Sequence, residues 1–273
     1  MLDAGKYGPA ALVLGGSEGI GRKFAEEIAA AGMDLVLVAR NRAPLEEAAA
    51  ALQSAHRVRV TALQRDLTAP GFEDFVGDIL REHDIGLAVC NAGATHGVGH
   101  FLDGELARAQ SLVQLNCNVP LVIAHKVLNA RRAGKRGAGL VVVSSMSGVC
   151  GSGLVAAYAA AKAFQIALCE GLHWELAGEG LDVLCAVAGL TDTPAMRRSG
   201  VSFSAAAAAG YLAMDASHVA QGALAQLGRT AVWYAVGQQT ADAMRAMPRP
   251  QLTQAMSAGS AALFQVPVRP RPD

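Results

Sequence analysis

Tyr158 and Lys162 are the two side chains whose spacing points most directly to chemistry. They stand four positions apart in a stretch typical of a helix, so both project from one face. Ser145 comes earlier, directly after the run Leu140–Ser144, which is typical of a buried strand. Hydride addition to a ketone leaves an alkoxide, which needs a proton donor and a hydrogen-bonding partner. Tyr158 can donate that proton, and Ser145 can hold the oxygen.

Lys162 would keep that donor acidic enough to work near neutral pH. A free phenol has a pKa of about 10, and an ammonium about 5 Å away at an effective dielectric constant of about 20 contributes roughly 3 kcal/mol, or about 2 pKa units. We therefore expect Lys162 to lower the pKa of Tyr158. The alternative is that neither residue has a catalytic role, with Tyr158 packed in an ordinary helix and Lys162 exposed to solvent.

A glycine-rich loop follows the first apolar run and opens a helical stretch. Its spacing is Gly-x-x-x-Gly-x-Gly, which lets a pyrophosphate approach the backbone, where free N–H groups and the helix dipole meet its charge. The residues of this loop expected to contact a dinucleotide are Gly15, Ser17, Glu18, Gly19, Ile20 and Gly21. A plain strand-to-helix turn is the alternative.

The end of the second predicted strand indicates which dinucleotide binds. An NAD site usually has a carboxylate about 20 residues after the loop, which accepts from the ribose 2′-hydroxyl. Here the segment reads Ala39-Arg40-Asn41, and Arg40 offers a guanidinium that can bind a 2′-phosphate. NADP(H) is therefore the expected cofactor. The alternative is that Arg40 lies in solvent at the end of the strand and binds no cofactor. Asp66, with Leu67 beside it, can accept from the adenine amino group or cap a turn.

Short strand-like runs alternate with longer helical ones along the whole chain. This alternation predicts one α/β domain over residues 1–273, a Rossmann-type doubly wound parallel sheet of about seven strands with helices on both faces. Its catalytic and binding residues should lie in the strand-to-helix loops. The strands are expected at Ala10–Leu14, Leu35–Val38, Val58–Leu63, Leu87–Cys90, Leu140–Ser144, Asp182–Ala186 and Ala231–Val236. Helices are expected at Gly19–Ala31, Pro44–His56, Glu105–Ala130 and Ala157–Ala177.

Composition excludes several classes of protein. The 273 residues carry 23 basic and 23 acidic side chains, so no net field attracts nucleic acid or acidic membrane. The longest uncharged stretch, 137–161, contains many serines and glycines, which argues against a membrane span.

The five cysteines form no Cys-x-x-Cys pair, and no export signal is recognised, so we expect free thiols and a cytoplasmic protein. His96 and His100 stand four apart, but the glycines between them argue against a helix, and no metal site is expected.

Taken together, these motifs resemble the short-chain dehydrogenase/reductase family across nearly the whole chain. The resemblance implies an NADP-dependent enzyme acting on CH–OH groups, with Ser145, Tyr158 and Lys162 as catalytic residues and Asn116 holding a proton-relay water; Asn118 is a nearby competitor. It also implies further cofactor contacts at Asn91, Ala92, Gly93, Gly189, Thr191 and Thr193. Two positions depart from the family pattern: Leu14 lacks a hydroxyl that joins the glycine loop to its neighbour, and Ala188 replaces a proline.

Within that family, the opening Lys6-Tyr7-Gly8 and the segment Ala30-Ala31-Gly32-Met33 look like bacterial NADP-dependent 7β-hydroxysteroid dehydrogenases. Apolar residues in a predicted substrate lid, residues 190–214, suit a small apolar ketone or alcohol. A 3-oxoacyl (carrier or CoA) reductase is the alternative, to which a basic cluster at 131–136 could contribute as a carrier dock. A non-catalytic dinucleotide-binding regulator is a third. The long predicted helices suggest a homodimer or homotetramer, and residues 266–273 form a tail.

Overall fold

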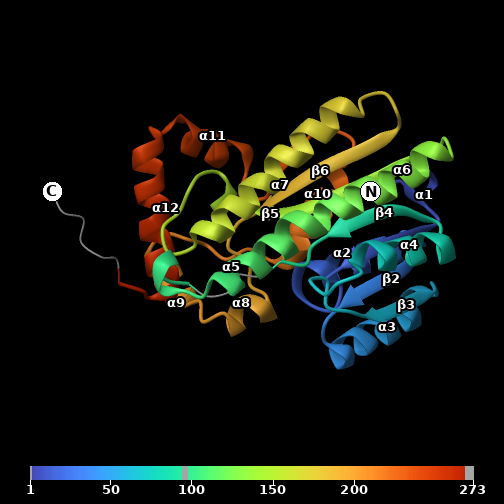
Figure 1. Cartoon of the computed structure of the whole chain (residues 1–273), viewed down its shortest axis with the longest axis horizontal. Coiled ribbons are helices and arrows are strands. Elements are labelled where there is room, and N and C mark those ends of the chain that lie inside the picture. The colour runs from blue at the N-terminus through green and yellow to red at the C-terminus, as the bar shows by residue number, and fades with distance from the viewer. Residues whose placement is uncertain (1, 94–97, 268–273) are drawn as a thin grey trace.

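A seven-stranded parallel sheet runs through the computed structural model, which describes residues 2–93 and 98–267 (Figure 1). Across the sheet the strands are β3 (Val60–Gln64), β2 (Asp34–Ala39), β1 (Ala10–Leu14), β4 (Ile85–Cys90), β5 (Ala138–Ser145), β6 (Leu181–Ala188) and β7 (Val232–Tyr234). The strand order reverses between β1 and β4, and ligands of doubly wound sheets bind outside the carboxyl ends of the strands at such a point. The predicted fold is confirmed.

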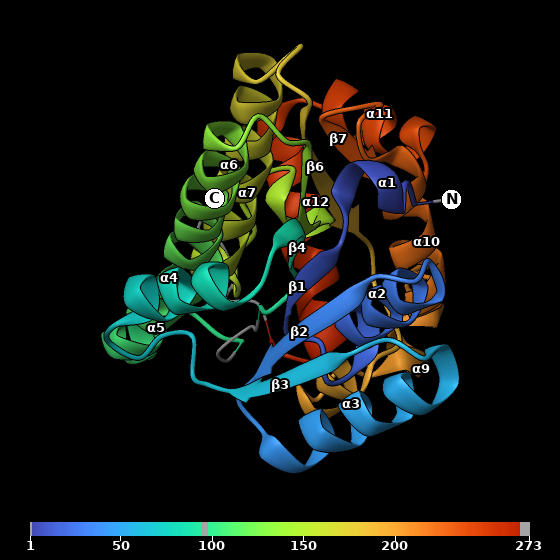
Figure 2. The same cartoon turned by 90° about the vertical axis from the view of Figure 1, so that its right-hand side faces the viewer.

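Helices cover both faces of the sheet, because the strands are apolar on both sides (Figure 2). One face packs against α4 (Phe72–Glu82), α6 (Val119–Ala133) and α7 (Ala156–Glu175). The other packs against α2 (Gly19–Ala30), α3 (Arg42–His56) and α10 (Ala216–Gln226). The glycine loop after β1 and the helix that carries Tyr158 and Lys162 therefore belong to opposite layers.

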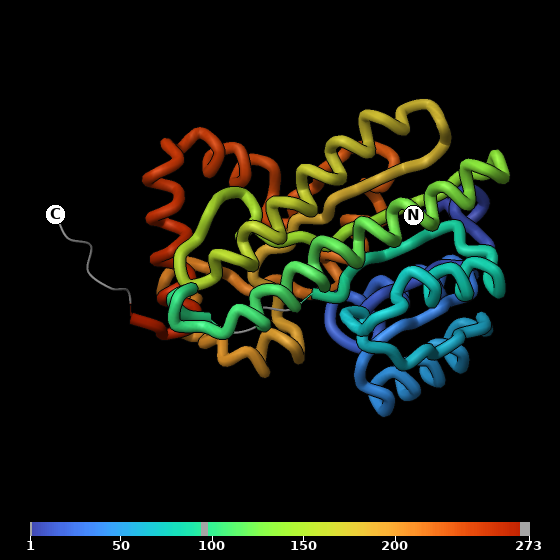
Figure 3. Tube along the Cα trace, viewed as in Figure 1, coloured from blue at the N-terminus to red at the C-terminus, as the bar shows by residue number. Residues whose placement is uncertain are grey.

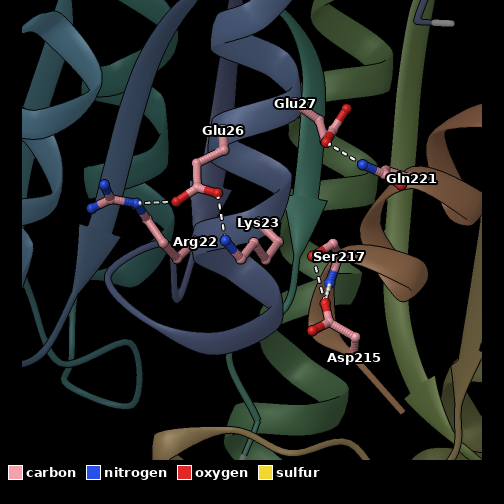
Figure 4. A network of polar contacts seen from close by, with 7 residues as sticks. All are labelled: Arg22, Lys23, Glu26, Glu27, Asp215, Ser217 and Gln221. Carbon is pink, nitrogen blue, oxygen red and sulfur yellow. Dashed lines mark hydrogen bonds and ion pairs between the residues drawn. The ribbon is translucent and has the colours of Figure 1, made fainter. Parts of the chain in front are cut away.

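Polar contacts hold α2 and α10 together on their solvent side (Figure 4). Gln221 donates to the carboxylate of Glu27 over 2.7 Å. Within α2, Glu26 accepts from Arg22 over 3.0 Å and from Lys23 over 2.8 Å. These contacts support the helix that begins at the glycine loop.

Strand boundaries differ from the predicted ones by at most two residues, in the central strands as well as at the sheet edges. The third strand begins at Val60 rather than Val58, because the Asp34 carboxylate accepts from the Arg59 amide over 2.9 Å. The last strand spans only Val232–Tyr234, since it pairs with β6 alone and a turn follows in which Gly237 donates to Tyr234.

The helix predicted over Glu105–Ala130 is interrupted. It consists of α5 (Leu106–Val113), a π-helical turn η2 (Gln114–Asn118) and α6. The π turn displaces the backbone at Asn116, and such turns often mark functional sites. Two short 3-10 turns, η1 (Phe101–Asp103) and η3 (Met146–Gly148), flank this region in sequence.

Several helices were not predicted. They are α1 (Ala4–Tyr7), α4, α8 (Pro194–Arg198), α9 (Phe203–Ala208), α10, α11 (Gln238–Ala246) and α12 (Arg249–Phe264). Figure 3 shows α12, in red, beside the yellow-green segment that precedes α7. No helix among the described residues is long and apolar enough to cross a membrane. His96 and most of the predicted tail lie outside the described residues.

Replacement of Gly21 by alanine tests the packing of the glycine loop. A Cβ at Gly21 would clash with the carbonyl of Gly15 and stand 2.5 Å from Asn91 Nδ2. We expect Gly21→Ala to destabilise the protein by about 2 kcal/mol, as overpacked sites do, measured by urea unfolding.

Gly77→Ala is the matched control for that substitution. Gly77 also lies inside a helix, where an added Cβ meets only the tip of Arg81, at 3.4 Å. Helix propensity then predicts a gain of about 0.5–1 kcal/mol. Equal effects of the two substitutions would contradict the packing argument.

Candidate active site

A cleft of about 380 Å³ opens at the carboxyl ends of the strands. Nearly all of the predicted site residues line it, although they come from loops far apart in sequence. They are Gly15, Ser17, Glu18, Gly19, Ile20, Arg40, Asn41, Asp66, Leu67, Asn91, Ala92, Gly93, Ser145, Tyr158, Lys162, Gly189, Thr191 and Thr193. Gly21 and Asn116 do not line the cleft, but each lies next to a residue that does, Gly21 beside Asn91 and Asn116 beside Gly93.

The glycine loop is joined to the segment after β4 without a hydroxyl at Leu14. Asn91 Nδ2 donates to the Gly15 carbonyl over 3.1 Å, and the Ala92 amide donates to the Leu14 carbonyl over 2.8 Å. Gly15 has φ +80°, a left-handed conformation that favours glycine. The side chain of Asn91 and the backbone therefore make the connection between the two segments that the missing hydroxyl would otherwise support.

One end of the cleft is cationic. Arg40 and Arg65 both line it, beside Asp66. Asp66 accepts from the amide and hydroxyl of Thr68, over 2.9 and 2.7 Å, and these hydrogen bonds are the main cause of its lowered pKa. The turn-capping alternative for Asp66 is thus realised, while the residue also faces the cleft. No sequence pattern indicated Arg65, because only the fold brings it beside Arg40.

The other end of the cleft holds the three residues predicted to do the chemistry. Ser145 ends β5, and its hydroxyl accepts from the Ser147 amide over 3.2 Å. Tyr158 and Lys162 project from α7, with Lys162 Nζ 5.6 Å from the centre of the Tyr158 ring. The predicted spacing therefore brings a hydroxyl, a phenol and an amine together.

The pKa of Tyr158 does not move in the predicted direction. Burial raises it above its usual value, and a hydrogen bond with Ser145 lowers it only in part. The expectation that Lys162 produces a net lowering is therefore wrong for this structure. A Coulomb argument from distance alone omits the cost of burying a phenolate.

Lys162 is buried, and protein groups accept from two of its three ammonium hydrogens. Its Nζ donates to the Val143 carbonyl over 2.9 Å and to Gln165 Oε1 over 3.0 Å. Burial lowers the pKa of Lys162 from 10.5 to about 8. The amide of Gln165 continues the network, since its Nε2 donates to the Asn116 carbonyl over 2.8 Å. Gln165 could not be predicted from the sequence, because a glutamine one turn after the lysine has no distinctive pattern.

Asn116 reaches this network through the π turn. Its Nδ2 donates to the Leu112 carbonyl over 3.0 Å, while its Oδ1 is buried and accepts from none of the described residues. A Cβ added at Gly93 would stand 2.9 Å from that Oδ1 and 3.2 Å from Lys162 Nζ. Asn116, rather than Asn118, is thus the asparagine placed behind the cleft.

The segment predicted as a lid closes on itself and touches the glycine loop. A backbone bridge joins Thr191 to Met214, so the two ends of the segment meet. From α8, Arg198 pairs with Glu18, and one of the contacts measures 3.0 Å. Arg198 also lines the cleft.

The cleft fits a nicotinamide dinucleotide. Bare glycine backbone faces it where α2 begins, arginines lie at one end, and the tyrosine and lysine lie at the other. The helix start and cations suit phosphates, and the orphaned Oδ1 of Asn116 leaves a buried acceptor behind the tyrosine and lysine.

Three of the four basic side chains in the cluster at 131–136 form ion pairs within the chain. Arg131 is buried and binds Asp84 over 2.7 Å, as well as the Gly8 and Gly137 carbonyls. Arg132 pairs with Glu179, and Arg136 pairs with Asp84.

Comparison with known proteins agrees with the fold and the cleft, which together define an oxidoreductase that uses a nicotinamide dinucleotide. Residues 9–201 match the family model described as short chain dehydrogenase. The chain belongs to this family.

Individual relatives give finer detail. The 7β-hydroxysteroid dehydrogenase of Clostridium sardiniense is 30% identical over 224 residues, which cover 82% of this chain and 84% of that protein. A very-long-chain 3-oxoacyl-CoA reductase of Coprinopsis cinerea is 30% identical over 181 residues, 65% of this chain and 53% of that protein.

Solved structures show the same relationship. One of a 7β-hydroxysteroid dehydrogenase aligns with a TM-score of 0.85 and 26% identity, covering 94% of this chain and 99% of that one. A short-chain dehydrogenase from Sphingobium yanoikuyae in complex with NADPH aligns with a TM-score of 0.75 and 29% identity, covering 88% and 97% of the two chains.

The lowered pKa of Lys162 predicts how stability depends on pH. Below the folded-state pKa of about 8 both states hold the proton, and the cost of burying the charge is constant. Above that pH the folded state loses the proton while the unfolded chain still holds it, so the free energy of unfolding rises with pH. The rise ends at the unfolded-state pKa of Lys162, 10.5. From about pH 7.5 to about pH 9.5, Lys162 should add about 2 kcal/mol to the free energy of unfolding.

Lys162→Met should lack that rise, which urea unfolding at the two pH values measures. Lys126→Met, on neighbouring α6, is the matched control and should follow wild type within about 0.5 kcal/mol. Parallel pH curves for wild type and Lys162→Met would show that the lysine is not destabilised by burial.

Proposed function

We propose that this protein is an NADP(H)-dependent oxidoreductase that interconverts a ketone and a secondary alcohol on an apolar substrate, with a hydroxysteroid as the leading candidate. The placement of Ser145, Tyr158 and Lys162 around one end of a cleft that the glycine loop and Arg40 also line carries the proposal. Similarity to 7β-hydroxysteroid dehydrogenases over most of the chain supports the substrate class.

The chain's own residues divide the work. When bound, the nicotinamide group supplies or accepts a hydride. Ser145 holds the substrate oxygen, and Tyr158 gives a proton to the developing alkoxide or takes one from the alcohol. Lys162, held by Val143 and Gln165, stabilises the ionised form of the tyrosine and binds the cofactor's ribose. Because Tyr158 is buried, a negative charge on its oxygen is energetically costly. The ammonium of Lys162 therefore stabilises the site most during proton transfer, when that charge develops.

Tyr158→Phe tests the proton transfer. Loss of a general acid costs about 10²–10⁴ in rate, so turnover of a responsive ketosteroid should fall by that factor. Binding of NADPH, followed by quenching of intrinsic fluorescence, should stay close to that of wild type. Tyr234→Phe, on β7 and outside the cleft lining, is the control and should remain active. Turnover by Tyr158→Phe at the wild-type rate would contradict the proposed proton transfer by Tyr158.

The same assay separates the substrate classes. A 3-oxoacyl reductase is the second candidate, favoured by the similarity to very-long-chain 3-oxoacyl-CoA reductases. Its carrier-docking version is weakened by the ion pairs of the basic cluster. Turnover of 3-oxoacyl thioesters and indifference to ketosteroids would select it. A non-catalytic regulator predicts NADPH binding with no turnover of either class.

Arg40 and Arg65 support the choice of NADP(H), because two guanidinium groups can bind a 2′-phosphate. Removal of a charge-assisted hydrogen bond costs about 1.5–3 kcal/mol, so Arg40→Ala should raise the Kd for NADPH by at least about tenfold and leave that for NADH unchanged. Arg42→Ala removes a neighbouring arginine that pairs with Glu46, and should change neither Kd. Equal loss of both dinucleotides in Arg40→Ala would contradict the assignment.

A cytoplasmic location and a homo-oligomer belong to the same proposal. All five cysteines are free, as in a reducing compartment. Exposed Val113, Leu121 and Phe164 lie on or between the helices expected to mediate subunit packing. The closed segment 190–214 is proposed as the substrate lid.

A further inference from the structure

Helix α12 contacts two segments that are far apart in sequence, and each segment leads directly to cleft residues. One is the loop 149–154, which lies between Ser145 and Tyr158. The other is the proposed lid, residues 190–214, which contributes Met196 and other residues to the cleft. The helix itself lies outside residues 9–201, which match the family model, and lines no part of the cleft.

Serine hydroxyls of α12 hold the loop 149–154. The Gly153 amide donates to Ser257 Oγ over 2.7 Å. Ser152 and Ser260 share a hydrogen bond of 2.9 Å, and both are buried. At the start of the helix Arg249 donates to the Val149 carbonyl over 3.0 Å. Three points of contact thus fix a short loop against one helix face.

The loop needs such support because its backbone is strained. Leu154 has φ +66°, a left-handed conformation that leucine rarely adopts, and its side chain is buried. A conformation of this kind persists only where the surrounding structure holds it. The Leu154 carbonyl also accepts from the Gly99 amide over 2.9 Å, so the strained residue is held from a second side.

The opposite side of α12 holds the lid. The Ser202 amide, at the start of α9, donates to the Leu263 carbonyl over 3.0 Å. Tyr211 packs so closely on Gly259 that a Cβ added there would clash with the phenol oxygen. Only glycine allows this approach of the lid to the helix. One helix therefore contacts both the loop before Tyr158 and the lid.

We propose that α12 is a brace that sets the spacing between the loop 149–154 and the lid, and so selects ketones by size. Ser257 and Gly259 are its positioning residues, and neither touches the cleft. This inference rests on the proposed function, because the size selection concerns the ketone that the cleft would reduce.

Hydrogen exchange tests the brace without any need for turnover. Ser257→Ala removes the acceptor of the Gly153 amide, so peptides covering 149–154 should exchange about tenfold faster. Gln254→Ala, at an exposed position of the same helix, is the matched control and should leave exchange there unchanged. Unchanged exchange in Ser257→Ala would overturn the brace.

Gly259→Ala tests the size selection. The added methyl group pushes Tyr211 away from α12 and widens the spacing, so kcat/KM for a bicyclic ketone should rise at least about fivefold relative to that for a monocyclic ketone. The Kd for NADPH should stay as in wild type, which a general loss of structure would not allow. An unchanged ratio overturns the link between the brace and selectivity.

The two experiments separate failure of this inference from failure of the proposed function. A wild-type enzyme that reduces neither of these ketones nor any ketosteroid rejects the proposed function, and the size selection with it. The exchange comparison would still decide whether α12 holds the loop.

Discussion

The buried amine of Lys162 is the constraint on which this site depends. A charge removed from water needs hydrogen-bonding partners, and the Val143 carbonyl and the Gln165 side-chain oxygen accept from two of the three ammonium hydrogens. In return, Ser144 Oγ donates to the Lys162 carbonyl over 2.8 Å, so β5 and α7 are bonded in both directions. Tyr158 lies one turn earlier on α7. The contacts of Lys162 therefore also fix the position of Tyr158 relative to Ser145 at the end of β5.

Sequence patterns predicted the features that depend on local periodicity. Strands buried on both faces read as continuous apolar runs, as for Ala10–Leu14, whose bounds the structure reproduces. The spacing of Tyr158 and Lys162 also carries over, because it follows from helix geometry alone. Gln165 and Arg65 escaped prediction, since each acquires its neighbours only when distant segments meet. The pKa of Tyr158 was mispredicted for a related reason, because burial belongs to the whole fold.

The departures from the family pattern show how the same arrangement can be maintained by different groups. Leu14 has no hydroxyl, yet its carbonyl accepts from Ala92 while Asn91 binds Gly15. At Ala188 no proline limits the backbone, but Gly189 packs so tightly that an added Cβ would stand 2.6 Å from Val236 and 2.9 Å from Met214. Close packing thus restricts a backbone that proline would otherwise restrict.

The bridge between Thr191 and Met214 holds the two ends of the enclosed segment side by side, so that changes within the segment need not reach the sheet. Because the chain leaves and returns at one point, residues could be inserted or deleted between these positions without moving β6 or α10. The entropy of closing such a loop grows only slowly with its length. Evolution can therefore exchange this segment, and with it the range of accepted molecules, at little cost to folding.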